Sequence, residues 1–189
     1  MQPIVQAYRD AFIEVIGQPD RESDLPVPWF ARNSWDRVQW APYVGDCFGP
    51  GALAFGINVE FLPTWRKIRP RLQISALEEC LRPLGKDEWH WEGRPGFLCR
   101  NPEVVPLYQH QPLSQIDLTR WLHNLDEILD GRRTWRDGRP MRPQLQVMRR
   151  IGPARLGASA DEIRHAMRRA AADMQPLMDL LRNRRSQWQ

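Results

Sequence analysis

Apolar residues spaced three and four positions apart predict helices in four segments of the chain, at about 3–16, 75–82, 114–129 and 159–185. Three of these segments begin with a pair of residues at capping-box spacing, namely Ser75 with Glu78, Ser114 with Asp117 and Ser159 with Glu162. Glycine follows the first and third segments, at Gly17 and Gly131, and suits a helix end. The sequence therefore predicts at least four amphipathic helices.

Strict alternation marks one strand clearly, because every second residue is large and apolar through Leu53, Phe55, Ile57, Val59 and Phe61. The turn-rich stretch GDCFGPG separates it from another segment, about 35–44, and predicts an antiparallel hairpin. Shorter strands are predicted at 88–92, 96–100, 104–109 and 144–150. The expected fold class is α+β, with an antiparallel sheet of about five short strands, flanking amphipathic helices and a C-terminal helical segment.

The chain divides into a single α+β domain over 1–150 and a basic C-terminal helical segment over 151–189. That segment carries a narrow apolar stripe of Ile163, Met167, Ala170, Met174, Met178 and Leu181. Such a stripe fits docking on the domain or pairing with a second copy, which would make the protein a homodimer. Pro176 is expected to kink the helix or split it in two.

Composition restricts the class of protein. With 42% apolar and 26% charged residues among 189, the chain resembles a soluble globular protein. No apolar run reaches the roughly 20 residues that a membrane span needs, so we expect no membrane contact and a cytoplasmic location. Three cysteines without CxxC spacing indicate reduced thiols. Neither a nucleophile elbow nor a phosphate-cradling loop is present, so the sequence predicts no catalytic residue, metal or cofactor.

One stretch, DEWHWEG, invites a metal-site interpretation. On a strand, Glu88, His90 and Glu92 would share one face, but the two glutamates would stand about 13 Å apart, too far to share an ion. We therefore expect a solvated polar face. A nuclease centre is also disfavoured: Asp46 and Glu60 could supply carboxylates, but the position two past Glu60 is leucine rather than lysine.

Charge is divided unevenly along the chain. Residues 1–131 carry 13 basic and 18 acidic side chains, net −5, whereas residues 132–189 carry 14 basic and five acidic ones, net +9. The segment RRTWRDGRPMR, residues 132–142, lies where the sign changes and places a tryptophan among arginines, as in a stacking platform for a nucleic-acid base. The candidate nucleic-acid-binding residues are Arg132, Arg133, Trp135, Arg136, Arg139, Arg149, Arg150, Arg168 and Arg169.

Two functional hypotheses follow from this asymmetry. The first is a non-catalytic module whose basic third contacts nucleic acid through phosphate. The second is a protein-interaction or assembly role, in which the basic third docks on an acidic protein partner or on another copy. A metal-dependent nuclease-like enzyme ranks third.

Overall fold

The computed structural model describes most of the predicted elements. It covers residues 2–18, 21–22, 30–31, 38–45, 52–59, 61–84, 89–92, 111–112, 117–134, 138, 140, 143, 145–152 and 159–182. Its helices are α1 (Gln2–Val15), α2 (Leu62–Ile68), the short 3-10 helix η2 (Arg69–Arg71), α3 (Ile74–Leu81), α4 (Leu118–Leu129) and α5 (Ala160–Arg182). Its strands are β1 (Arg21–Glu22), β2 (Phe30–Ala31), β3 (Val38–Gly45), β4 (Ala52–Val59), β5 (Trp89–Glu92), β6 (Gln111–Pro112) and β7 (Leu145–Gly152).

The main sheet is antiparallel with the order β3-β4-β7-β5-β6. This confirms the α+β class and the hairpin of β3 with β4. The prediction of about five short strands was wrong about their lengths. Three strands, β3, β4 and β7, have eight residues each and form the body of the sheet. β5 and β6 add only four and two residues at one edge. The strands predicted at 96–100 and 104–109 lie outside the described residues.

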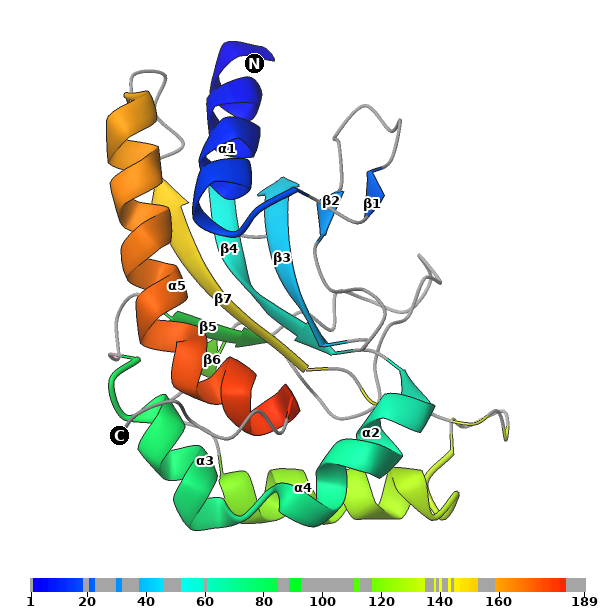
Figure 1. Cartoon of the computed structure of the whole chain (residues 1–189). Helices are drawn as coiled ribbons and strands as arrows, with labels where there is room; N and C mark the ends of the chain where they lie inside the picture. Colours follow the sequence, from blue (N-terminus) through cyan, green and yellow to red (C-terminus); the bar gives the residue numbers. More distant parts are fainter. Residues whose placement is uncertain are drawn as a thin grey trace.

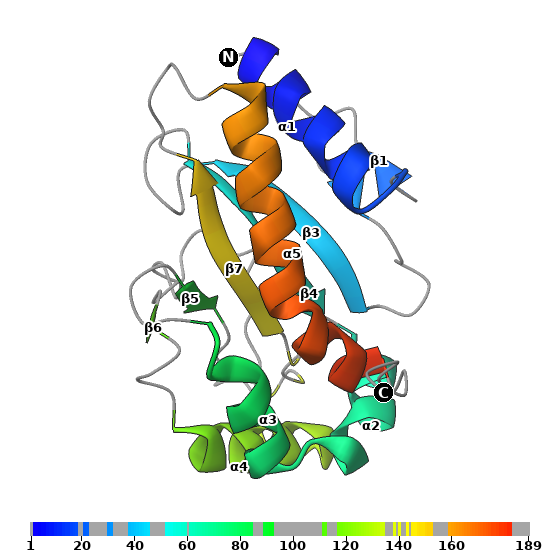
Figure 2. The same cartoon turned by 60° about the vertical axis from the view of Figure 1, so that its left-hand side comes forward.

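Helices α1 and α5 lie side by side over one face of the sheet (Figures 1 and 2). The rings of Phe12 from α1 and Phe55 from β4 meet edge to face at 6.2 Å, and Trp40 of β3 stacks on Phe55 at 5.3 Å. The Tyr8 hydroxyl, from α1, donates to the carbonyl of Ala54. Tyr8, Phe12 and Phe55 of this layer are among the largest fully buried side chains, and they belong to one core cluster that also includes Trp65 of α2.

The opposite face of β4 is buried as well. The alternation predicted one buried face, but residues 53–59 are all buried, and the second face carries Ala54, Gly56 and Asn58. These residues are small or polar, so in the sequence pattern they resemble the exposed face of a strand. In the structure their small size lets neighbouring segments approach that face closely. Phe61 does not belong to the strand: it is 37% exposed and stands directly before α2.

A second helical group lies beyond one end of the sheet, where α2, α3 and α4 lie close together (Figure 1). The amphipathic helix predicted at 114–129 is confirmed in its buried face, which carries Trp121, Leu122, Leu125 and Ile128. Its predicted capping box at Ser114 was wrong, because α4 begins at Leu118 and Asp117 itself caps it by accepting from the backbone N–H of Arg120. The capping box at Ser75 was wrong, because α3 begins at Ile74 after Gln73. Helix α2 was missed, although Pro63 stands in its first turn.

Helix α5 docks on the body of the same chain. Its stripe is fully buried, and it contacts α1, α3, β3, β4 and β7. Pro176 lies inside a single continuous helix, so it does not split the segment, although the last turns, in red, veer away from the first (Figure 1). Among the described residues no helix, including this one, combines the length and apolarity needed to cross a membrane.

Candidate nucleic-acid interface

The arginine loop, defined as residues 132–142, follows the end of α4. Gly131, with a φ of 72°, ends the helix, and the backbone N–H groups of Arg132 and Arg133 donate to the carbonyl of Glu127. Thr134 then pairs with Pro140 in an isolated antiparallel bridge, and Gly138 adopts a φ of 79° between them. Arg132, Thr134, Gly138 and Pro140 are exposed. The bridge therefore brings the two sides of the loop together, and the loop is exposed to solvent at these four residues.

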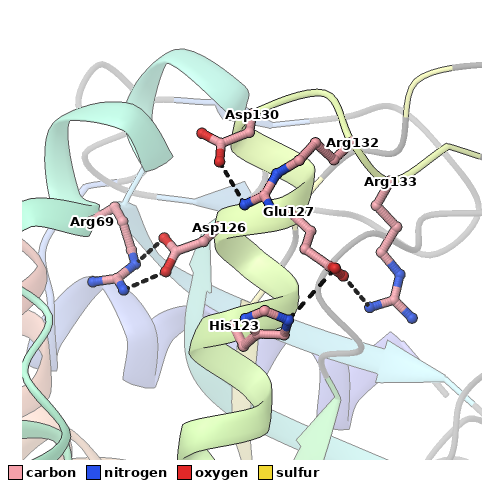
Figure 3. A network of polar contacts seen from close by, with 7 residues as sticks. All are labelled: Arg69, His123, Asp126, Glu127, Asp130, Arg132 and Arg133. Carbon is pink, nitrogen blue, oxygen red and sulfur yellow. Dashed lines mark hydrogen bonds and ion pairs between the residues drawn. The ribbon is translucent and has the colours of Figure 1, made fainter.

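The loop is fastened at its entry by side chains of α4 (Figure 3). Arg133 donates to the Asn124 side-chain carbonyl and lies 3.5 Å from a carboxylate oxygen of Glu127. The other oxygen of Glu127 lies 3.5 Å from His123 Nε2. Arg133 is partly buried, so its guanidinium fixes the direction in which the chain leaves the helix.

The exit of the arginine loop is fastened from α2. The indole N–H of Trp65 donates to the carbonyl of Pro143 at 3.0 Å, and both residues are buried. Trp65 also meets Trp121 of α4 edge to face at 6.0 Å. The guanidinium of Arg69, which directly follows α2, donates two hydrogen bonds of 2.5 and 2.6 Å to the carboxylate of Asp126 in α4. These contacts join α2, α4 and both ends of the loop into one unit.

Of the candidate nucleic-acid-binding residues in the arginine loop, the structure describes Arg132 and Arg133. Arg132 is 60% exposed and pairs with Asp130 at 2.7 Å (Figure 3). By sequence Trp135, Arg136 and Arg139 lie between the bridged residues, at positions outside the described part of the chain.

The remaining predicted arginines do not join the loop. Arg149, on β7, is buried and pairs with Asp173 of α5 at 2.9 Å, which removes it from any surface contact. Arg168 pairs with Glu14 of α1, and its neighbour Arg169 is exposed on α5. Arg150 stands opposite Ala54 in the sheet, and its side chain lies outside the described part. The first half of α5 lies at the other end of the molecule from α4 (Figures 1 and 2), so the set is divided between two regions.

Some of the charge asymmetry is neutralised within the chain. Arg164 and Arg168 of the basic third both pair with Glu14 of the acidic body, and Arg132 and Arg133 pair with Asp130 and Glu127. The pair of Arg132 with Asp130 and the pair of Arg168 with Glu14 are exposed on both sides, so each is weak and open to exchange with another anion.

The DEWHWEG stretch forms β5 from Trp89 to Glu92, as predicted, while Glu88 lies outside the described residues. The sheet register sets His90 opposite Met148 and Glu92 opposite Gln146. Gln146 in turn stands opposite Asn58, and Asn58 opposite Gln39. A row of polar residues therefore crosses four strands, and its two described side chains, Gln39 and Asn58, are only 5% and 3% exposed.

No cluster of three metal-ligating side chains occurs in the described part of the chain. His123 and His165 are exposed. Burial, followed by the charges of Glu79 and Asp179, raises the pKa of the Cys80 thiol, which keeps it in the unreactive protonated form. Asp46, Glu60, Cys47, Cys99 and His110 lie outside the described residues.

Sequence reasoning located the arginine loop but missed both of its fastenings. The exit contact depends on α2, whose signal was Pro63 followed by Trp65 and Ile68 at helical spacing. Comparison with protein-family models, with curated proteins and with solved structures finds no match.

Proposed function

We propose that this chain is a non-catalytic module that binds nucleic acid through the arginine loop. The observation that carries the proposal is the Thr134–Pro140 bridge, which closes an arginine-rich segment whose two ends are fastened to α4 and α2. A loop held in this way loses little conformational entropy when it binds a ligand. A cytoplasmic location, where nucleic acid is abundant, belongs to the same proposal.

The chemistry of the segment suits phosphate. A guanidinium group donates two parallel hydrogen bonds to phosphate oxygens, and residues 132–142 hold five arginines against one aspartate. The exposed pair of Arg132 with Asp130 is weak enough for a phosphate to replace the carboxylate. In this proposal Trp135 stacks on an unpaired base.

The proposed contact set is narrower than the set predicted from sequence. Arg132, Arg136, Arg139 and Trp135 contact the ligand, whereas Arg133 holds the base of the loop. Arg149 is excluded by burial, and Arg168 and Arg169 belong to a separate region.

The test is the binding of a fluorescein-labelled oligo(dT) measured by anisotropy over a range of salt concentrations. Replacing Arg136 and Arg139 by alanine should weaken binding by about tenfold or more and reduce the salt slope by about 1.4, because each lost phosphate contact removes about 0.7 on a single strand. A matched control, Arg120→Ala with Arg169→Ala, removes two exposed arginines from helix surfaces and should bind like the unmodified protein.

Equal weakening in both variants would indicate general charge attraction and contradict a site at the loop. A protein partner that binds saturably and is not displaced by nucleic acid would instead support the interaction role. The absorbance ratio at 260 and 280 nm of the purified protein, before and after a high-salt wash, provides an independent check for bound nucleic acid.

A further inference from the structure

The sheet carries buried polar residues on the face opposite α1 and α5, the two helices that cover its other face (Figures 1 and 2). Phe55 of β4 meets Phe12 of α1, and side chains alternate along a strand, so Asn58 lies on the opposite face. Asn58 is 3% exposed, and Gln39, its register partner on β3, is 5% exposed. Two amide side chains are therefore enclosed on the face that α1 and α5 do not cover.

The strand register continues this polar row across the sheet. Gln146 of β7 stands opposite Asn58, and Glu92 of β5 stands opposite Gln146. The row therefore runs through three amide residues and ends at a glutamate. Neighbouring strands lie about 4.8 Å apart, so four strands place these positions along about 14 Å.

Gln39 is the member of this row whose side chain is free to bind a ligand. It makes no side-chain hydrogen bond with any residue that the structure describes, although it is only 5% exposed. A buried amide is normally paired, because leaving it unpaired in the interior costs free energy. The Gln39 amide offers N–H donors and a carbonyl acceptor side by side, so it suits a ligand that presents both kinds of group.

The chemistry of the row suits the edge of a nucleobase. Base edges present donors and acceptors in one plane, and asparagine and glutamine side chains pair with them through two hydrogen bonds. A glutamate carboxylate accepts from the exocyclic amine of a base. Three amide residues followed by a glutamate therefore match a base better than they match an apolar or a purely anionic ligand.

An arginine position lies on the same face of the sheet. Arg149 of β7 pairs with Asp173 of α5, so the next residue, Arg150, occupies the opposite face. Arg150 stands opposite Ala54, four residues along β4 from Asn58, which is about 13 Å. A guanidinium group binds phosphate oxygens through two parallel hydrogen bonds. The face therefore combines a row suited to a base with a position suited to a phosphate.

We propose that this face of the sheet binds a mononucleotide, with the amide row pairing with its base and Arg150 binding its phosphate. The enclosure of Gln39 and Asn58 favours a free nucleotide over a nucleotide within a strand, because a polymer needs an open path along the surface. The site is separate from the arginine loop and goes beyond the function proposed for that loop.

The experiment measures binding of the four ribonucleoside monophosphates and their nucleosides to the full chain by isothermal titration calorimetry. We expect at least one monophosphate to bind with a Kd below about 1 mM. It should bind about tenfold more tightly than its nucleoside, because the phosphate adds charge-assisted hydrogen bonds. Arg150→Met should remove this difference between the monophosphate and the nucleoside.

Gln39→Leu tests the amide row. It removes a buried amide that has no described partner, so the ligand-free variant should melt at the same temperature as the unmodified protein or higher. Its affinity for the monophosphate should nevertheless fall about tenfold, the loss expected for a pair of hydrogen bonds to a base. A purely structural role of Gln39 would instead lower the melting temperature. Gln6→Leu, on the exposed side of α1, is the matched control and should keep the affinity unchanged.

The outcomes separate this site from the arginine loop. The inference is overturned if no mononucleotide binds, or if Gln39→Leu and Arg150→Met bind it as tightly as the unmodified protein. Arg136→Ala with Arg139→Ala should bind the mononucleotide normally, and a loss in that variant would also overturn a separate site. If the mononucleotide binds but no oligonucleotide does, the function proposed for the loop fails and this inference stands.

Discussion

Gly56, in the middle of β4, lies too close to the neighbouring strand β7 to carry a side chain. A Cβ atom added there would stand 1.8 Å from the carbonyl oxygen of Val147 and 2.8 Å from both Cα and Sδ of Met148. Because part of this obstruction is backbone of the neighbouring strand, no side-chain rotation relieves it. We expect Gly56→Ala to lower the free energy of unfolding by about 3 kcal/mol or more, measured by urea denaturation.

Gly138 provides the control for this substitution. It has open space around it but a φ of 79°, so Gly138→Ala meets only backbone strain and should cost about 1 kcal/mol. Equal losses at the two glycines would mean that the close approach of β4 to β7 is not what Gly56 provides.

The ion pair of Arg149, on β7, with Asp173, on α5, links the helix to the sheet at a largely buried position. The side chain of Arg149 is 8% exposed and that of Asp173 is 38% exposed. We expect Asp173→Ala to cost about 2 kcal/mol, because it leaves a buried guanidinium without this carboxylate, while the exposed side of the pair moderates the loss. The double variant Arg149→Met with Asp173→Ala should recover most of that stability in the same measurement. A double variant as unstable as the single one would contradict this explanation.

Among the elements, α5 begins with a reciprocal cap. The backbone N–H of Ser159 donates to the Glu162 carboxylate at 2.7 Å, and the backbone N–H of Glu162 donates to the Ser159 hydroxyl at 3.2 Å. The Ser159 backbone bond, followed by its side chain, lowers the pKa of Glu162 below its ordinary value of 4.5. The cap predicted from sequence is confirmed at this helix.

This cap gives a pH-dependent prediction. Because the pKa of Glu162 is lowered by folding, its contribution to stability is present above the pKa of the unfolded chain and disappears as pH falls through the lower, folded pKa. The stability difference between the unmodified protein and Glu162→Gln should therefore be constant near pH 7 and shrink toward pH 3. Ser159→Ala should cost about 1 kcal/mol at neutral pH. Thermal melts over that pH range measure both effects.

Elements with a long, one-sided pattern could be predicted from sequence, and the others could not. The stripes of α1, α4 and α5 reflect one buried face each, which is the condition that makes a helical period visible. Helix α2 has seven residues and is too short to show a clear helical period. The alternating pattern of β4 also continues to Phe61, so it hid the point where α2 begins. The two-sided burial of β4 was hidden because alanine and glycine read as an exposed face.

At the scale of the whole molecule, the division into residues 1–150 and 151–189 can be tested by truncation. Helix α5 covers α1, β4 and β7, so a chain ending at residue 158 would expose their core face. We expect that chain to show no cooperative thermal transition by circular dichroism, whereas a chain ending at residue 182 keeps it. A cooperative transition in the shorter chain would show that residues 1–158 fold alone and that α5 is an appendage.

The candidate site was only partly predictable for a reason that also belongs to this scale. The charge asymmetry is visible in the sequence, but its neutralisation depends on contacts between distant residues, such as Glu14 with Arg164 and Arg168. Likewise, nothing in the sequence distinguishes Arg149 from the other candidate arginines. Its burial and its pairing with Asp173 of α5 are visible only in the structure. Residue type located the arginine loop, and only the tertiary structure separated it from the other arginines.

The position of β7 has a consequence for how the chain reaches this structure. β7 pairs with both β4 and β5, although about 85 residues of sequence separate it from β4 and about 50 from β5. The two halves of the sheet therefore have no partner for their inner edges until residues 145–152 have been synthesised and inserted. Pairings between distant segments close slowly, because loop entropy is lost before contacts form. During synthesis the inner edges of β4 and β5 stay open, and this interval is when the nascent chain is most exposed to aggregation.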